Sequence, residues 1–275
     1  MPISVFRELR AVWRLTRVVG LVLRGIFMVR FRFQHWSPDQ RRARKQDWSR
    51  RLVEALGVSF ATNRTELPAG ILIVCNHISW LDVFVMNAIT PTTFVCKDDV
   101  KDWPAIGWLV EHSGTLFIER GSRTAAARSA QAMAARMAGE ERVAVFPEGT
   151  TTQGTSMLPF RAALFQAAID AQALVQPASL RYRDANGAPC TAPAYDGDLS
   201  FGQSMLNIVR ASGIRAELRF LDALAPADER RELARLSETA IALDLGLLLN
   251  PGEQVMDCAA RGPAEALEPA PARIS

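Results

Sequence analysis

Several features that would point to other protein classes are missing from this sequence. The 275 residues include only four cysteines and no Cys-x-x-Cys pair, so a zinc ribbon or a thioredoxin-like redox motif has no support. There is no Gly-x-Ser-x-Gly nucleophile elbow, no phosphate-binding P-loop and no cluster of metal ligands. We therefore expect no metal and no cofactor, and a reducing cytosolic setting.

Long apolar runs are also missing near the start. Arginines interrupt every candidate run in residues 6–33, so no cleavable signal peptide is visible. The longest uncharged stretch falls short of the roughly 20 residues that a spanning helix needs. What the region does have is positive charge: residues 1–50 carry a net charge of +9, against +3 for the whole chain. A basic N-terminal segment in an otherwise mildly acidic chain suggests that this segment meets an anionic partner.

Residues 1–57 are predicted to form a pair of amphipathic helices. On a helix with about 100° per residue, one stripe of the first helix holds arginines and the opposite face is apolar. The arginines are Arg7, Arg10, Arg14, Arg17, Arg24 and Arg32; the apolar residues are Val12, Leu15, Val19, Val22, Leu23, Ile26 and Phe27. This pattern favours a helix lying in an anionic membrane interface. A core-facing helix and a tilted spanning segment are the alternatives.

The second helix is predicted over residues 38–56, with Ser37 as N-cap and Pro38 at its first position. Its arginines and lysine also suit nucleic acid. Nucleic acid does not require an apolar face on the neighbouring helix, however, so we expect no nucleic-acid partner.

Residues 58–250 are predicted to form a single α/β domain, with a central mostly parallel or mixed sheet flanked by helices. Strands are expected at residues 71–75, 93–96, 116–118, 143–146, 174–178 and 214–221. Helices are expected at residues 79–88, 103–112, 122–138, 162–171 and 226–248. Residues 251–275 are rich in Ala, Pro and Glu and are expected to be disordered.

One of three histidines directly follows a buried strand and precedes a helix. His77 thus lies at the carboxyl end of a strand, where α/β sheets bind ligands. Asp82 follows five residues later, and on an ideal helix the two side chains would point about 140° apart. They can meet only across a turn, for which Ser79, a natural N-cap, gives a reason. Ser79 and Asp82 alone also fit a capping box, in which Asp82 merely accepts from a backbone N–H.

Three further strand ends carry polar or flexible residues. Arg120 follows a short strand and suits a bidentate grip on phosphate, unless it only pairs with the preceding glutamate. Another strand runs into Gly149, where the backbone can approach a ligand closely, and Thr150, whose N–H and hydroxyl can hold an anion. Val175 and Pro177 mark a fourth strand end. In one sheet, these ends would form one cleft.

These segments resemble the four sequence blocks of the glycerolipid acyltransferases, the family of 1-acylglycerol-3-phosphate acyltransferase. Asn76-His77 through Asp82 matches the N-H-x-x-x-x-D block, and Phe117-Ile118-Glu119-Arg120 the second. Phe146-Pro147-Glu148-Gly149-Thr150 matches the third and Val175-x-Pro177 the fourth, in the same order and with similar spacing over about residues 60–220. The first and third blocks together are strongly specific; the other two are weak alone.

The resemblance implies a role for each matched residue. His77 would act as general base on an acceptor hydroxyl, and Asp82 would orient and stabilise it. The acceptor's head, typically phosphate and glycerol, would be bound by Arg120, Glu148, Gly149 and Thr150. Val175 and Pro177 would help shape the acyl or thioester pocket. Candidates for a supporting part are Asn76, Ser79 and Lys97, the last matching a lysine common after the first block.

The implied protein is a membrane-associated O-acyltransferase at the cytoplasmic face of the inner membrane. It would move a fatty acyl group from acyl-CoA or acyl-carrier protein to a lysolipid hydroxyl. The expected acceptor is 1-acylglycerol-3-phosphate, which would give phosphatidic acid for phospholipid synthesis. The stretch from Asn76 through Gly107-Trp108 to Gly121 also resembles enzymes that acylate lyso-ornithine lipid. A thioesterase or lipase is a more distant alternative, which the missing nucleophile elbow disfavours.

The chain departs from the family pattern in two places. The family often has F-K-x-G after the third block, whereas this chain has Phe160-Arg161-Ala162-Ala163. Asp98 and Asp99 stand after Lys97, where a glutamate is more usual.

Overall fold

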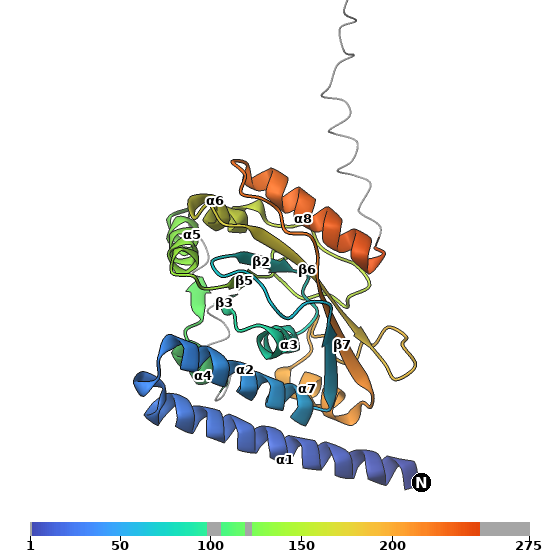
Figure 1. The fold of residues 1–275 in the computed structure, drawn as a ribbon. Coiled ribbons are helices and arrows are strands. Elements are labelled where there is room, and N and C mark those ends of the chain that lie inside the picture. The colour runs from blue at the N-terminus through green and yellow to red at the C-terminus, as the bar shows by residue number, and fades with distance from the viewer. Residues whose placement is uncertain (1, 98–105, 119–122, 248–275) are drawn as a thin grey trace, which may run out of the picture.

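A computed structural model describes residues 2–97, 106–118 and 123–247 of the chain (Figure 1). Arg120, the start of the helix predicted at 103–112, and the predicted tail at 251–275 lie outside the described residues. The side chain of Lys97 also lies outside them, although its backbone is described.

The centre of the described fold is a seven-stranded sheet in the order β1-β7-β6-β2-β5-β3-β4. The strands are β1 (Val58–Thr62), β2 (Leu72–Cys75), β3 (Thr93–Lys97), β4 (Leu116–Ile118), β5 (Val143–Val145), β6 (Val175–Arg183) and β7 (Ile214–Phe220). Neighbouring strands are parallel except β6 and β7, which are antiparallel. The prediction of a mixed α/β sheet is thus confirmed.

Helices cover both faces of this sheet (Figure 1). They are α1 (Pro2–Phe31), α2 (Pro38–Ala55), α3 (Leu81–Ile89), α4 (Ile106–His112), α5 (Arg123–Ala138), α6 (Gln166–Asp170), α7 (Phe201–Arg210) and α8 (Arg230–Leu245). Short 3₁₀ turns occupy Phe33–His35 and Ala162–Phe165, so the helix predicted at 162–171 is α-helical only in its second half.

Alternation along β2 divides the core into two clusters, because successive side chains of a strand point to opposite faces. Ile73 and Cys75 belong to the first cluster, with α2, α3 and α7. Leu72 and Val74 belong to the second, with α5, α6 and α8. β2 is buried along its whole length, as its continuous apolar sequence predicts.

Strand β6 is longer than predicted. The sequence indicates a strand that ends beside Pro177, at residue 178, but the strand continues to Arg183. Antiparallel pairing with β7 begins only at Ala178, so the missing N–H of Pro177 interrupts no rung of that ladder. This extension carries Tyr182 to the carboxyl end of β2.

Helix α2 is part of the first core cluster. The Ser37 side chain accepts from Gln40 N and the Gln40 side chain accepts from Ser37 N, so the predicted N-cap at the break before Pro38 is confirmed. Leu52 and Val53 are buried, and α2 packs extensively on α3. The predicted domain boundary at residue 57 therefore follows a helix that already belongs to the body of the fold.

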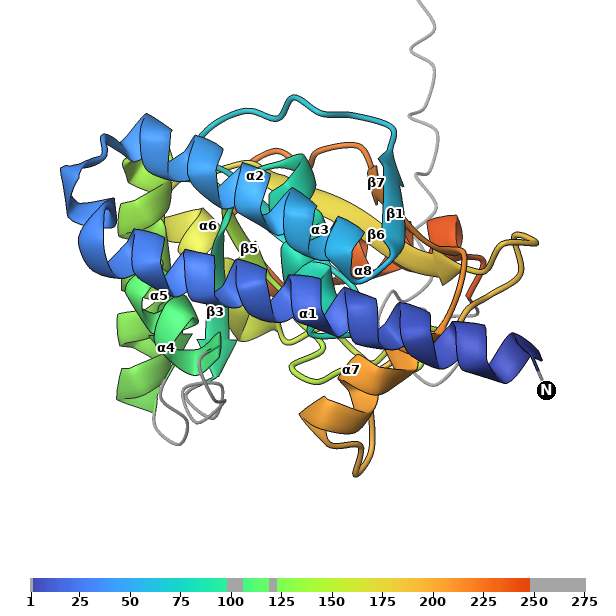
Figure 2. The same cartoon turned by 90° about the horizontal axis from the view of Figure 1, so that it is seen from below.

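Helix α1 lies across the outside of the molecule against α2, α4 and α7 (Figures 1 and 2). Only Ala11 and Val18 of its described side chains are buried hydrophobics. Its large exposed hydrophobics have exposed fractions between 53% and 72%; they are Val5, Phe6, Leu9, Val12, Trp13, Val19, Leu23, Phe27 and Phe31, called the α1 stripe below. Among the described residues, no helix is long and apolar enough to cross a membrane.

The two predicted faces of α1 are only partly correct. Leu15 and Val22, assigned to the apolar face, pack against the first core cluster instead of joining the α1 stripe. Arg14, assigned to a free basic stripe, donates to the carbonyl oxygens of Val209 (2.9 Å) and Ala211 (2.6 Å). These carbonyls lie at the C-terminal end of α7, where unpaired oxygens attract a cation.

Candidate active site

A turn at the carboxyl end of β2 brings His77 and Asp82 together. The chain between Cys75 and Leu81 is not helical, and the distance from His77 Nδ1 to Asp82 Oδ2 is 2.8 Å. Asp82 Oδ2 also accepts from the backbone N–H groups of Ile78 (2.7 Å) and Ser79 (2.9 Å). Asp82 thus fulfils both interpretations of the sequence, because one carboxylate oxygen holds the turn and the imidazole together.

The second oxygen of Asp82 has a partner that the sequence did not reveal. Tyr182, on β6, donates its hydroxyl to Asp82 Oδ1 at 2.7 Å, and both residues are buried. Burial and the negative charge of Asp82 raise the pKa of Tyr182 well above its ordinary value, so the hydroxyl keeps its proton and acts as a donor. Four donors therefore stabilise a carboxylate that has no access to solvent.

The His77 ring is fixed on a second side by an aromatic residue. It stacks on Phe146, with ring centroids 3.8 Å apart and an interplanar angle of 7°. With Asp82 bound at Nδ1, that nitrogen carries the proton of the neutral ring and Nε2 has the free lone pair. Nε2 has no hydrogen-bond partner among the described residues, and His77 lines a cavity. The geometry is that of an imidazole general base oriented by a carboxylate.

Glu148 lies behind this site. Its Oε1 accepts from the backbone N–H of His77 (2.7 Å) and its Oε2 from that of Leu158 (2.8 Å). Burial raises the pKa of Glu148 to about 7, against the opposing effect of these two hydrogen bonds. Glu148 is absent from the residues that line the cavity, so its described contacts brace His77 and do not give it the predicted position against an acceptor head.

Asn76 and Ser79 also act on the backbone. The Asn76 side chain accepts from Leu180 N (2.7 Å) and donates to Leu180 O (2.9 Å), which ties the end of β2 to β6. Ser79 Oγ accepts from Leu81 N (3.2 Å) at the start of α3. Their predicted supporting part is thus a structural one.

Gly149, Thr150 and Arg161 line the cavity together with His77. Gly149 has φ +73°, a backbone conformation that favours glycine, and a Cβ there would lie 2.6 Å from the guanidinium carbon of Arg161, so the Arg161 side chain lies close against this glycine. No ion pair holds the Arg161 side chain within the described residues. Arg161 stands where the family often has the lysine of F-K-x-G, which is the signal that could have identified it.

Val175 and Pro177 lie within the sheet and not in the cavity lining. Val175 is fully buried in the second core cluster, and Pro177 pairs with Val74 inside the sheet. Neither lines the cavity that His77 lines, so the structure does not bring them to the reacting centre. Their part in an acyl or thioester pocket stays a prediction, as do the roles of Arg120 and Lys97.

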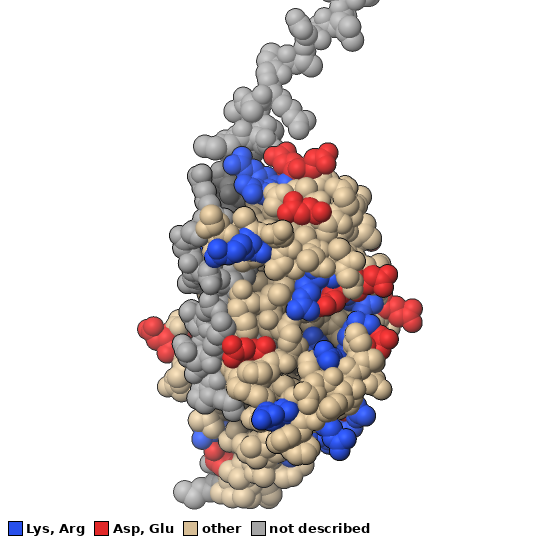
Figure 3. Space-filling model, turned by 90° about the vertical axis from the view of Figure 1, so that its left-hand side faces the viewer, with Lys and Arg blue, Asp and Glu red and all other residues tan. Residues whose placement is uncertain are grey.

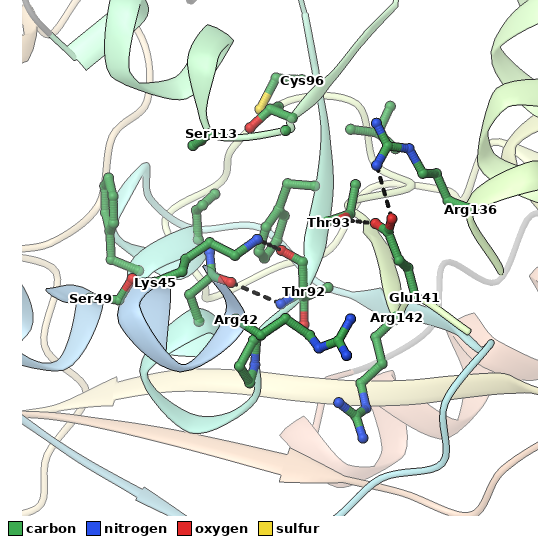
Figure 4. A pocket seen from close by; sticks show the side chains of 18 of the residues that line it. Arg42, Lys45, Ser49, Thr92, Thr93, Cys96, Ser113, Arg136, Glu141 and Arg142 are labelled. Atoms are coloured by element: carbon green, nitrogen blue, oxygen red, sulfur yellow. Dashed lines mark hydrogen bonds and ion pairs between the residues drawn. The ribbon is translucent and has the colours of Figure 1, made fainter. Parts of the chain in front are cut away.

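The cavity has a volume of about 1240 Å³ and extends well beyond His77. Part of its lining is apolar and includes Trp48, Phe84, Phe94 and Leu109. A second polar region follows, shown in Figure 4. Within the described residues no group of three or more His, Cys, Asp or Glu could hold a metal ion.

Comparison with known proteins gives consistent matches. The profile of a family described as Acyltransferase matches residues 59–181. The chain is 34% identical over 223 residues to a 1-acyl-sn-glycerol-3-phosphate acyltransferase of Neisseria meningitidis, covering 79% of this chain and 84% of that protein. It is 31% identical over 246 residues to a lyso-ornithine lipid O-acyltransferase of Pseudomonas aeruginosa, covering 86% of this chain and 94% of that one.

A solved structure has the same fold. The crystal structure of a 1-acyl-sn-glycerophosphate acyltransferase from Thermotoga maritima matches with a TM-score of 0.66 and 16% sequence identity. The match covers 95% of this chain and 99% of that one, so the N-terminal helices are included in the likeness.

Proposed function

Because the chain belongs to the glycerolipid acyltransferase family, we propose that it transfers a fatty acyl group from a thioester to the hydroxyl of a lysolipid, with 1-acylglycerol-3-phosphate as acceptor. The single observation that carries this proposal is the 2.8 Å contact between His77 Nδ1 and Asp82 Oδ2, in a histidine that lines a large cavity. Acyl-CoA and acyl-carrier protein are both suitable donors.

The reaction follows from the position of the imidazole. Nε2 of His77 takes the proton of the acceptor hydroxyl while the hydroxyl oxygen attacks the thioester carbonyl carbon. The tetrahedral intermediate collapses, the carbon–sulfur bond breaks, and the leaving thiolate takes the proton back from His77. Asp82 stabilises the imidazolium between these two steps. The thioester is already activated, so no nucleophile on the enzyme is needed.

The acceptor head is proposed to lie beside His77, against Gly149, Thr150 and Arg161. An arginine suits a phosphate, since its planar donors match two phosphate oxygens. Arg120 would add a second cation. The fatty acyl chain would occupy the apolar part of the cavity, to whose lining Trp48, Phe84 and Phe94 contribute.

The α1 stripe supports attachment to a membrane surface. Large apolar side chains that no other part of the described chain covers are typical of helices in a bilayer interface. Lysolipid acceptors reside in such a surface. We place the enzyme at the cytoplasmic face of the inner membrane, as a peripheral protein of phospholipid synthesis.

The lyso-ornithine relatives give a second candidate acceptor, with a zwitterionic head. A labelled acyl thioester offered with either acceptor decides between the two. We expect transfer to 1-acylglycerol-3-phosphate, which His77→Ala should reduce by about 10³-fold because the general base is lost. His112→Ala is the matched control, since its ring also stacks on an aromatic residue, Trp108, but is exposed.

Three results would contradict the proposal in different ways. Transfer only to the lyso-ornithine lipid would correct the acceptor and keep the mechanism. Release of free fatty acid with either acceptor present would indicate a thioesterase. Full activity of His77→Ala would remove the mechanism.

A further inference from the structure

Besides the residues around His77, the cavity is lined by a second cluster of charged side chains. Arg42 and Lys45 come from α2, Arg136 from α5, and Arg142 from the residue before β5; we call these four the basic cluster. Figure 4 shows their side chains gathered around one polar region of the cavity, and Figure 3 shows basic and acidic groups around a hollow on one side of the molecule.

The basic cluster has few anionic partners. Glu141 pairs with Arg136 at 2.9 Å and accepts from Thr93 Oγ1 at 2.6 Å. Arg42 pairs with Asp39, whose side chain is 86% exposed and therefore contributes little inside the cavity. Glu140 also lines the cavity, but in the part of the chain that the structure describes it forms no ion pair with the four cations.

Lys45 and Arg142 donate their hydrogen bonds to neutral groups. Lys45 Nζ donates to Thr92 O at 2.8 Å, and Arg142 donates to the carbonyl oxygens of Leu67 (2.5 Å) and Pro68 (3.0 Å). These contacts give both residues a structural role as well, because each satisfies a loop carbonyl. The hydrogen bonds fix the positions of Lys45 and Arg142, but their carbonyl partners carry no negative charge that would balance the two cations.

The cations of the cluster affect one another. Burial lowers the pKa of Lys45 to about 8; Glu141 acts in the opposite direction, and Arg136 and Arg42 add to the lowering. Burial and then Arg42 lower the pKa of Arg142. Arg42 is thus close enough to act on both neighbours, and an anion placed among the three would relieve their repulsion.

We propose that Arg42, Lys45 and Arg142 bind the phosphate group of a phosphate ester in this part of the cavity. Arginine forks suit phosphate, and a lysine adds a point charge. Arg42 is the most available of the three for an anion, because it lines the cavity and its guanidinium pairs only with an exposed carboxylate among the described residues.

The position limits what the phosphate can belong to. Arg142 lies directly before β5, and Phe146, whose ring stacks on His77, lies directly after it. The backbones of these two residues are therefore roughly 13 Å apart along the strand. A soluble phosphate ester would reach His77 only with an extended linker, as in coenzyme A. A bilayer phospholipid would bind with its headgroup phosphate alone. The assignment to a soluble ester such as coenzyme A rests on the proposed acyltransferase function. The assignment to a phospholipid headgroup does not.

The test measures ligand binding without an acyl donor, so no acyl transfer can take place. Free coenzyme A is titrated calorimetrically into the full chain carrying Arg161→Gln, which silences the proposed acceptor site. Adding Arg42→Gln should weaken coenzyme A binding about tenfold or more, because a charge-assisted hydrogen bond to phosphate is lost. Binding of phosphatidylglycerol-containing vesicles is measured in parallel. Thermal midpoints confirm that each variant is folded.

Arg51→Gln is the matched control. Arg51 also lies on α2 and pairs with an acid one turn earlier, Asp47 at 2.9 Å, but it does not line the cavity. If Arg42→Gln and not Arg51→Gln weakens coenzyme A binding, the soluble ester is supported. If only vesicle binding responds in this way, the site holds a lipid headgroup. Equal behaviour of the two variants in both assays overturns the proposal. Because no acyl transfer is measured, this outcome is independent of the catalytic assay.

Discussion

The carboxyl end of β2 and helix α1 differ in where their side chains find partners. At the end of β2, Asp82 has four donors from the chain itself, and His77 is held by Asp82, Glu148 and Phe146. In α1, nine large hydrophobic side chains are exposed. The first region finds its partners within the chain, whereas the large apolar side chains of the second are not covered by any part of the described chain. Changes in the first should therefore alter chemistry, and changes in the second should alter location.

The largest effect is expected at the centre of the first region. Asp82→Asn should lower the rate of acyl transfer by about 10³-fold, because an amide cannot accept from all four donors or stabilise the imidazolium. Initial rates and circular dichroism check this. Asp244→Asn, which removes a carboxylate held by Ser179 and Arg181, is the control and should remain active. Similar rates for the two variants would contradict the role of Asp82.

The second prediction separates location from chemistry. Leu23→Ser with Phe27→Ser should weaken binding to lipid vesicles about a hundredfold, since two large side chains no longer enter the bilayer. Activity on a detergent-solubilised acceptor should persist. Leu243→Ser is the control, because Leu243 is 71% exposed but lies on α8, on the opposite side of the molecule (Figure 1). Unchanged sedimentation with vesicles would refute the assignment of α1.

The third prediction concerns the hidden partner of Asp82. Tyr182→Phe should reduce kcat about tenfold, because the buried carboxylate of Asp82 loses the donor to its Oδ1. Initial rates at saturating substrate check this. Ser179→Ala removes another buried hydroxyl-to-carboxylate bond from β6, to Asp244 at 2.6 Å, and should leave kcat unchanged. An unchanged kcat in Tyr182→Phe would reduce Tyr182 to a packing role.

The last prediction concerns Glu148 and is the only one of the four that addresses stability and not rate or location. Its pKa is about 7 in the folded chain against an ordinary 4.5, so the folded chain holds a proton that the unfolded chain releases. Its contribution to the free energy of unfolding therefore falls as pH rises from about 4.5 to 7, by on the order of 3 kcal/mol. Glu148→Gln should flatten this slope in urea unfolding measured at several pH values. Exposed Glu54→Gln should keep it.

The two regions also differ in how far the sequence predicted them. The turn from His77 to Asp82 depends on six consecutive residues, so the spacing alone indicated that the two side chains can meet only across a turn and not along a helix. Tyr182 lies 100 residues further along the chain, and no local pattern links it to Asp82. The part of Glu148 as a brace to the His77 backbone depends on the register of β5 beside β2 and could not be read from either segment.

For α1, periodicity predicted a helix with an apolar face but not the direction of that face. Leu15 and Val22 have the same apolar character as the exposed residues of the α1 stripe; packing on the body decides which are covered. Arg14 shows the same limit, since its partners are the carbonyls at the end of α7, a helix that the sequence did not predict. Strand β1, short and buried only at Val58, was also missed.

The backbone of His77 is held on both sides by the segment after β5. Its N–H donates to Glu148 Oε1, and its carbonyl oxygen accepts from Thr152 N at 2.9 Å. The proposed general base is therefore held by two stretches of chain more than seventy positions apart. Both members of the pair lie in the first third of the sequence, yet a shortened chain that ends before β5 would lack both of these backbone contacts to His77.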